Sequence, residues 1–317
     1  MNLISNRKLL LALFALVFGA TFISGASTAS TTPPLKAGVT TETPLPIYTL
    51  PNTEILQTPA PKLAREYEAY IALPREYDKS TKKYPVLYVT DAGYAFPLIR
   101  AIAARVRDHG VGLEDFILVG LSYAKGENGV LSRNRDYTAA YAANKVVVTN
   151  DTKGGVYGQA DAYLTFLKQD LIPAIEKRYR VDTTKRLYVG HSYGSLLGIH
   201  SLFTSPQTFT HYILGSPSLW FDAHRVFDAE KAFAATRAAM PAKVRFYIGE
   251  YEQIKKGNSR YYKTRDMVGD LDRFVKQISA RRYKGLDIQR TVLPDEDHAT
   301  VFPALVTRGL MWALPTP

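Results

Sequence analysis

The nine residues "LYVGHSYGS" at positions 187–195 decide the fold class. Leu187 to Val189 are the end of an apolar strand, and the run "SLLGIHSLF" that follows Gly194 has the composition of a helix. A sharp turn from strand to helix forces its central residue, Ser192, into a strained backbone conformation. Small neighbours let the two elements pack closely. The pattern therefore predicts that Ser192 projects its hydroxyl above the edge of a sheet.

A serine between two glycines, with a strand before it and a helix after it, is typical of the nucleophile elbow (G-x-S-x-G) of α/β-hydrolases. The alternative is a turn rich in glycine and serine that carries no chemistry. Other apolar or alternating stretches predict strands within 65–74, 84–90, 114–123, 210–218, 243–252 and 287–295. Helical patterns lie between them, and Pro173 is expected to kink one of these helices. This order predicts an α/β fold with a mostly parallel central sheet covered by helices on both faces.

The first 29 residues have the composition of a secretory signal peptide. Two basic residues precede a short apolar run, and small residues follow, so cleavage is expected after Ala26 or Ala29. The run is shorter than the ~20 residues of a membrane span, which argues against an uncleaved anchor. We therefore expect a periplasmic or secreted protein with no stable membrane insertion after cleavage.

The rest of the chain divides into two parts. Residues 30–62 are rich in Pro and Thr and predict a leader whose later part is an edge strand or an extended arm. Residues 63–317 are expected to form a single α/β-hydrolase domain.

The composition restricts the chemistry. There is no cysteine, so disulfides, thiolate catalysis and thiolate metal sites are excluded. No other metal site and no cofactor is expected. The formal net charge of +11 suits anionic partners, although ordinary solvated charge is the alternative. No nucleic-acid-binding motif is present, so a nucleic-acid partner is not expected.

A serine nucleophile needs a base and a group that orients the base, in the chain order serine, acid, histidine. His298 lies in "LPDEDHATVFP", after the last predicted strand, and is the candidate base; the alternative is a solvated loop histidine. The stretch "GEYEQ" offers Glu250 and Glu252 as the acid. We favour Glu252, although either glutamate could instead be solvated or contact the substrate. The acidic residues 295–297 are a further local source of support for His298.

The oxyanion of an acyl-transfer intermediate needs backbone N–H donors. One is expected from Tyr193, directly after the nucleophile. The other should follow strand 84–90, where Ala92 and Gly93 are the candidates. The alternative for this second stretch is a plain turn between a strand and a helix.

These stretches, together with "RNRDYT" (133–138), "SPSLW" (216–220) and "HATVFPALVTRGLMW" (298–312), resemble the esterase D-like family of α/β-hydrolases. The resemblance spans residues 84–312 and is strongest to the branch of siderophore trilactone (enterochelin-type) esterases. It implies a serine esterase that acts on a small-molecule ester, with Ser192 as nucleophile and His298 as base. Some siderophore esterases work with a Ser–His dyad, which leaves the role of Glu252 open.

The resemblance also implies substrate-binding residues. Arg133 and Arg135 fall where the family has a basic motif near the pocket, which suits an anionic or catecholate ligand. A structural ion pair with Asp136 is the alternative. Trp220 is expected as an aromatic wall of the cleft or as a core residue.

One departure concerns the oxyanion site. The family usually has Asp-Gly after the third strand, whereas this chain has Asp91-Ala92. Ala92 keeps its N–H but restricts the backbone, which puts its part as a donor in question.

Three functional classes follow from the sequence. The first is a serine esterase that forms an acyl-enzyme and acts on aromatic or anionic acyl esters, siderophore trilactones among them. The second is an acyltransferase on the same scaffold, and the third is a non-catalytic binding protein with the hydrolase fold.

Overall fold

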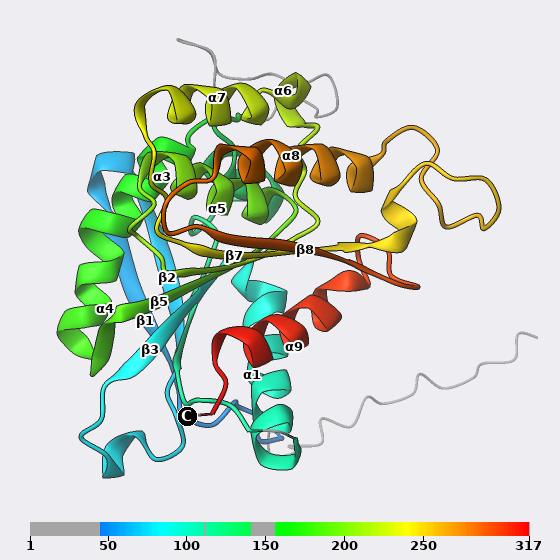
Figure 1. Ribbon diagram of the computed structural model, residues 1–317. Coiled ribbons are helices and arrows are strands. Elements are labelled where there is room, and N and C mark those ends of the chain that lie inside the picture. The colour runs from blue at the N-terminus through cyan, green and yellow to red at the C-terminus, as the bar shows by residue number, and fades with distance from the viewer. Residues whose placement is uncertain (1–44, 111, 141–155, 317) are drawn as a thin grey trace, which may run out of the picture. The chain divides into compact units, whose positions relative to one another are not determined.

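The computed structural model describes residues 45–110, 112–140 and 156–316. The predicted signal peptide and the first part of the predicted leader lie outside the described residues. From Thr49 onward the chain forms one compact unit. Its central sheet has eight strands in the order β1-β2-β4-β3-β5-β6-β7-β8 (Figure 1). The strand pairs from β4 to β8 are parallel, whereas β1 with β2 and β2 with β4 are antiparallel.

The elements follow the strand–helix alternation that the sequence predicts. The strands are β1 (Thr53–Ala60), β2 (Arg65–Ala72), β3 (Tyr84–Val89), β4 (Ile117–Leu121), β5 (Val181–His191), β6 (His211–Gly215), β7 (Lys243–Gly249) and β8 (Asp287–Leu293). The helices are α1 (Ala92–His109), α2 (Gly129–Tyr137), α3 (Ala160–Phe166), α4 (Ile172–Arg178), α5 (Tyr193–Thr204), α6 (Phe221–His224), α7 (Val226–Thr236), α8 (Met267–Arg281) and α9 (Val301–Ala313).

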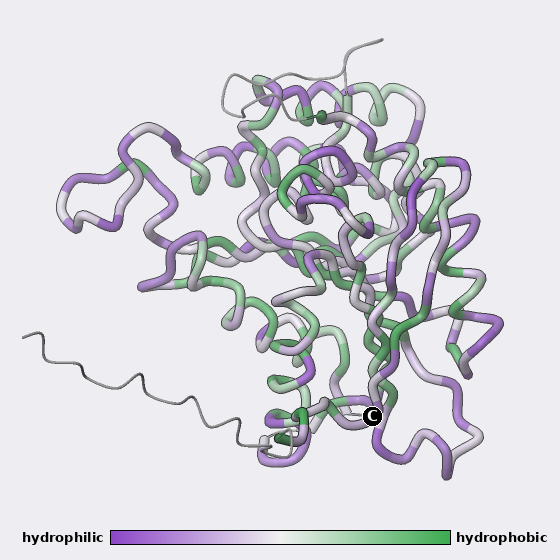
Figure 2. Tube along the Cα trace, turned by 180° about the vertical axis from the view of Figure 1, so that it is seen from behind, coloured by the Kyte–Doolittle hydropathy of each residue, from purple (hydrophilic) through white to green (hydrophobic). Residues whose placement is uncertain are grey.

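Helices cover both faces of the sheet. Helices α1 and α9 pack on one face, and α3, α4, α5, α7 and α8 lie on the other (Figure 1). All six residues of β3 are buried, because a parallel strand inside such a sheet is covered on both sides. The tube coloured by hydropathy shows hydrophobic residues gathered along the central strands (Figure 2). The expected mostly parallel, doubly covered sheet is confirmed.

The helix that Pro173 was expected to kink, which lies between β4 and β5, is interrupted close to that residue. Helix α3 ends at Phe166, a π-helical segment spans Leu167–Leu171, and α4 begins at Ile172. Pro173 has no N–H to donate to a carbonyl four residues earlier, so the regular α-helical ladder cannot continue through it.

β1 is the edge strand that the sequence offered, beside an extended arm, for the later part of residues 30–62. It pairs with β2 along its whole length, from Thr53 opposite Ala72 to Ala60 opposite Arg65. The compact unit therefore begins near Thr49 and not at residue 63. Among the described residues, no helix combines the length and the apolar character needed to cross a membrane.

The close approach of β5 and α5 generates the first prediction. A Cβ atom added at Gly190 would lie 2.4 Å from the carbonyl oxygen of Gly194, which is backbone and cannot move aside. We expect Gly190→Ala to lower the free energy of unfolding by about 1–3 kcal/mol, because overpacking a tight contact strains the backbone. Chemical denaturation measures this loss. The control is Gly93→Ala, where the added Cβ would meet nothing within 4 Å. Equal stability of the two variants would contradict the tight turn.

Candidate active site

Ser192 is the single residue between strand β5 and helix α5. Its φ of 59° and ψ of −116° place it in a conformation that residues other than glycine rarely adopt. Its N–H donates to the carbonyl of Gly215 at 2.9 Å, and its own carbonyl accepts from Ser195 and Leu196. These hydrogen bonds hold the strained turn between two regular elements. The sharp strand-to-helix turn predicted at Ser192 is therefore present.

A buried carboxylate faces a histidine beside this turn. Glu252 Oε2 lies 2.6 Å from His298 Nδ1. Glu252 is fully buried in a short 3₁₀ turn after β7, whereas His298 lies in the loop between β8 and α9. The other oxygen, Oε1, accepts from Ser216 Oγ at 2.5 Å and from Gly249 N at 2.9 Å. These donors satisfy one side of the buried carboxylate and leave the other side to the imidazole.

His298 also lies against the residue that precedes Ser192. The ring centroids of His298 and His191 are 4.6 Å apart. Burial first, and then the charges of His298 and Arg133, hold the pKa of His191 well below its usual range, so this ring stays neutral. The hydroxyl of Ser192 is 3.1 Å from that of Ser218. The carboxyl edges of β5, β6, β7 and β8 thus bring the serine, the histidine and the acid to one place.

The geometry separates the two candidate acids. Glu250 Oε1 accepts from the hydroxyl of Tyr261 at 2.6 Å, and Oε2 accepts from the N–H of Asp295 at 3.3 Å. These hydrogen bonds lower the pKa of Glu250 below its usual value. Glu250 holds the neighbouring loops, and Glu252 is the glutamate that contacts His298.

The acidic residues before His298 support its loop instead of touching its ring. Asp297 pairs with Arg260 at 2.8 Å and accepts from the N–H groups of Ala299 and Thr300. The Arg260 hydrogen bond is the main cause that lowers the pKa of Asp297 to about 2. Asp295 accepts from the hydroxyl of Tyr251 at 3.1 Å.

Two helices begin beside Ser192. Tyr193 is the first residue of α5, and Ala92 and Gly93 are the first two residues of α1. The first N–H groups of a helix have no acceptor within it, and the N-terminus carries partial positive charge. The left-handed residue is Asp91, with φ of 57°, whereas Ala92 is already helical. Alanine is favourable there, so the Asp-Ala departure does not strain this turn.

Arg133 is held inside the protein. Its Nε lies 2.8 Å from Asp91 Oδ1, and its Nη2 lies 3.2 Å from Asp91 Oδ2. Nη2 also lies 3.3 Å from the carbonyl oxygen of His191. The sequence offered a substrate contact or an ion pair with Asp136 for Arg133. Its ion-pair partner in the structure is Asp91, the residue that immediately precedes α1.

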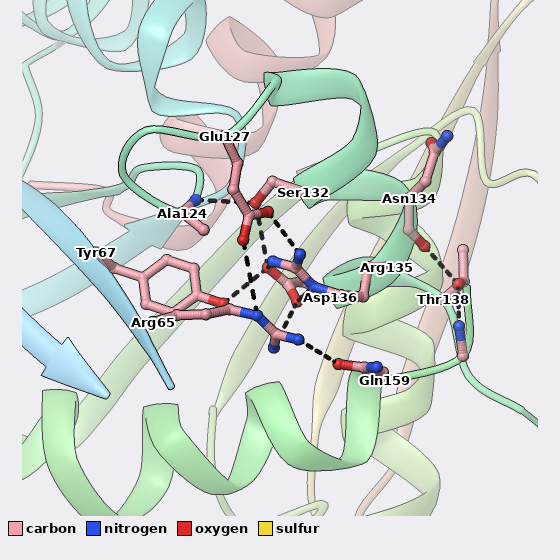
Figure 3. A network of polar contacts seen from close by, with 11 residues as sticks. Arg65, Tyr67, Ala124, Glu127, Ser132, Asn134, Arg135, Asp136, Thr138 and Gln159 are labelled. Atoms are coloured by element: carbon pink, nitrogen blue, oxygen red, sulfur yellow. Dashed lines mark hydrogen bonds and ion pairs between the residues drawn. The ribbon is translucent and has the colours of Figure 1, made fainter. Parts of the chain in front are cut away.

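Arg135 belongs to a separate buried network (Figure 3). Its Nε and Nη2 donate to Asp136 at 2.8 and 3.0 Å, and its Nη1 donates to Glu127 at 2.5 Å. Tyr67 also donates to Asp136, at 2.9 Å, and Arg65 lies within ion-pair distance of it. Only 8% of Arg135 is exposed. The contacts of Arg135 are therefore those of the structural ion pair with Asp136, the alternative that the sequence offered.

Trp220 lies close to the nucleophile turn. Its ring centroid is 6.1 Å from that of Tyr193, and the guanidinium of Arg265 stacks over it at 3.6 Å. The side chain is partly buried against the core, so it is both a packing residue and a neighbour of the site.

Four residues around the site were not singled out from the sequence, namely Asp91, Tyr123, Ser216 and Ser218. The two serines belong to "SPSLW", which drew attention only for its tryptophan. Tyr123 donates to Asp91 Oδ1 at 2.6 Å from the loop after β4. Their position in the sequence could have indicated them. Each follows a strand of the parallel sheet, and residues that follow parallel strands meet at one edge of the sheet.

Comparison with known proteins identifies the family of the chain. The family model described as "Putative esterase" matches residues 60–258, which is over half of the chain. The ferri-bacillibactin esterase BesA of Bacillus subtilis is 28% identical over 273 residues, covering 84% of this chain and 91% of that protein. The siderophore triacetylfusarinine C esterase of Aspergillus fumigatus is 26% identical over 291 residues, covering 84% and 94%.

Solved structures show the same fold. The siderophore hydrolase EstB from Aspergillus nidulans superposes with a TM-score of 0.71 at 23% identity, covering 86% of this chain and 99% of that one. The BES protein from Bacillus cereus gives a TM-score of 0.70 at 24% identity, covering 86% and 100%. The extent of the family match and the shared architecture lead to one conclusion: the chain belongs to this esterase family and is a carboxylic ester hydrolase with the α/β-hydrolase fold.

Proposed function

We propose that the chain hydrolyses its ester through an acyl-enzyme on Ser192, with His298 as the general base and Glu252 as the group that orients it. The observation that carries this proposal is the 2.6 Å contact between His298 Nδ1 and the fully buried Glu252. A carboxylate on Nδ1 leaves Nε2 as the nitrogen that can accept a proton. The ring of His298 lies beside the residue that precedes Ser192, with its centroid 4.6 Å from that of His191, so we propose that Nε2 takes the proton of the serine hydroxyl.

The chemistry follows from these positions. Ser192 Oγ attacks the ester carbonyl carbon while His298 Nε2 takes the hydroxyl proton, and the carbonyl electron pair moves onto oxygen. The N–H groups of Tyr193 and of Ala92 or Gly93 stabilise that oxyanion at the two helix N-termini. The intermediate then expels the alcohol, which receives the proton from His298. Water then attacks the carbonyl carbon of the acyl-enzyme while His298 takes its proton. Ser192 Oγ leaves with the proton from His298, and the acid is released.

The hydroxyl of Ser192 must turn from Ser218 to His298 for this reaction. The two serine oxygens are 3.1 Å apart, a distance typical of an ordinary hydrogen bond. Catalytic hydrogen bonds are often loose without substrate and tighten in the complex. In the proposed mechanism Ser218 is the hydrogen-bond partner of this hydroxyl before the substrate binds.

The proposed substrate is an ester of an anionic or catecholate acid, with siderophore lactones as the leading class. The curated relatives are named for siderophore esters. A basic loop, residues 253–266, follows Glu252 directly and projects from the sheet edge in Figure 1 (yellow to orange). Its basic residues are Lys255, Lys256, Arg260, Lys263 and Arg265. Figure 2 shows this loop as largely hydrophilic.

This basic loop replaces Arg133 and Arg135 as the proposed source of charge preference. Arg265 stacks over Trp220, which lies next to Tyr193, so the loop reaches the side of the nucleophile. Lys256 and Lys263 are exposed. Positive charge at the rim of a site raises the local concentration of anionic substrate.

Two further points complete the proposal. Hydrolysis is the activity named for the relatives, and no observation on the described residues favours acyl transfer. Residues 1–29 remain a proposed secretory signal, which would place the mature enzyme outside the cytoplasm; the N-terminal sequence of the mature protein tests this.

Ser192→Ala should abolish ester hydrolysis and leave the fold intact. Loss of a serine nucleophile typically costs on the order of 10⁶ in rate. The measurement is kcat on a p-nitrophenyl ester, with circular dichroism as the check on folding. Activity within tenfold of the wild type would rule out Ser192 as the nucleophile.

Replacing the two glutamates tests which one orients the base. Glu252→Gln should lower kcat by about 10²–10⁴, because the amide no longer fixes the histidine tautomer or stabilises the imidazolium. Glu250→Gln is the matched control and should stay within about threefold, since this side chain contacts only neighbouring loops. His298→Ala should be nearly as damaging as Ser192→Ala. If Glu252→Gln keeps kcat within threefold while His298→Ala is inactive, the enzyme works as a dyad.

Removing charge from the basic loop tests the substrate class. We expect Lys256→Ala/Lys263→Ala to lower kcat/KM for a p-nitrophenyl glutarate monoester by about three- to tenfold, and to leave the neutral butyrate unchanged. The difference should shrink as salt rises, because exposed charges are screened within about 8 Å at physiological ionic strength.

Lys82→Ala/Lys83→Ala is the control for this experiment, because it removes the same charge before the amino end of β3, at the opposite edge of the sheet. Equal effects of the two double variants would mean that only net charge matters. An unchanged ratio of anionic to neutral ester in both would remove the loop from the substrate site.

A further inference from the structure

Arg133 connects the two halves of the proposed oxyanion site. Its forked hydrogen bonds to Asp91 hold the residue that immediately precedes α1. Its Nη2 also donates to the carbonyl of His191, the residue that immediately precedes Ser192. The guanidinium carbon lies 5.3 Å from the ring centroid of Tyr193, the first residue of α5. One side chain of α2 thus contacts both turns that carry the proposed N–H donors.

Asp91 is held at more points than this ion pair. The hydroxyl of Tyr123 donates to its Oδ1 at 2.6 Å, and its own N–H donates to the oxygen of Tyr137 at 3.3 Å. Burial and the charge of Asp91 raise the pKa of Tyr123, so the phenol keeps the proton that it donates. Only 1% of Asp91 is exposed, and its φ of 57° is unfavourable for a residue with a side chain. These contacts stabilise a backbone conformation that would otherwise relax.

We propose that Arg133 is a positioning residue that fixes the spacing between the first N–H groups of α1 and α5, through Asp91 on one side and His191 on the other. The inference rests on the proposed function of Ser192. On this proposal the arginine helps to stabilise the transition state and does not recognise the charge of the substrate.

A guanidinium is suited to this connection. Its planar fork holds a carboxylate at two points and still offers a further N–H to a carbonyl, which a lysine ammonium cannot do in the same plane. Burial alone would lower the pKa of Arg133, but the charge of Asp91 and the hydrogen bonds to it outweigh burial and raise it. The guanidinium therefore stays charged. Removing either partner leaves the other as an uncompensated buried charge.

The test is a double-mutant cycle with Arg133→Gln, Asp91→Asn and the double variant, assayed on the neutral butyrate and the anionic glutarate esters. We expect each single change to lower kcat by about 10²-fold on both esters with KM within threefold, as for loss of an oxyanion donor. The double variant should lose no more than the worse single one, because the neutral pair leaves no buried charge. Arg133→Lys, which keeps the charge and is expected to fold, should fall between wild type and Arg133→Gln.

Affinity for butylboronic acid separates positioning from a general loss of structure. This acid adds to a serine hydroxyl and forms a tetrahedral anion, so its inhibition constant should rise in proportion to the loss of kcat in Arg133→Lys. An unchanged boronate affinity would overturn the inference. A raised KM for the glutarate ester alone, or a kcat within threefold of wild type for Asp91→Asn, would overturn it too. The proposed function fails separately, if Ser192→Ala stays active.

Discussion

The position of every group in the site is set relative to the backbone of Ser192, which turns the chain from β5 into α5 within one residue. That turn needs glycine on both sides of Ser192, because a Cβ at Gly190 would lie 2.4 Å from the carbonyl oxygen of Gly194 and a Cβ at Gly194 would lie 2.3 Å from Thr90 Oγ1. Two features offset the strain of this turn: the hydrogen bond from the N–H of Ser192 to the carbonyl of Gly215, and the helix that begins at the next residue. The proposed nucleophile, the proposed N–H donor beside it and the contact between the rings of His191 and His298 all depend on this geometry.

Glu252 joins the parts of the chain that complete the site. It accepts from Ser216 after β6, from Gly249 at the end of β7, and lies against His298 after β8. Both oxygens of a fully buried carboxylate need hydrogen-bond partners, so the three loops that supply these partners are held in one arrangement. Arg133 does the same on the other side of Ser192 for the turns after β3 and β5. A buried carboxylate on one side of Ser192 and the Arg133–Asp91 ion pair on the other thus organise the two halves of the proposed reaction, proton transfer and oxyanion stabilisation.

Local patterns in the sequence were sufficient for the parts of this account that depend on neighbouring residues. The turn at Ser192, the alternation of strands and helices, and the preference for Glu252 over Glu250 follow from spacing within a few residues. Pairings between residues far apart in the sequence could not be predicted in this way. Asp91 and Arg133 are 42 positions apart, and nothing local distinguishes that pair from Arg133 with Asp136. Arg135, in contrast, does contact Asp136. The sequence left the later part of residues 30–62 open between an edge strand and an extended arm, and the pairing of β1 with β2 decides for the strand.

The crystal structure of a phosphonate adduct tests the central claim most directly, that Ser192 is the nucleophile and that the N-termini of α1 and α5 bind the developing oxyanion. The account predicts phosphorus bonded to Ser192 Oγ, with one phosphoryl oxygen about 2.7–3.1 Å from the backbone nitrogen of Tyr193 and from that of Ala92 or Gly93. Attachment to another residue, or a phosphoryl oxygen directed away from both helices into solvent, would contradict it.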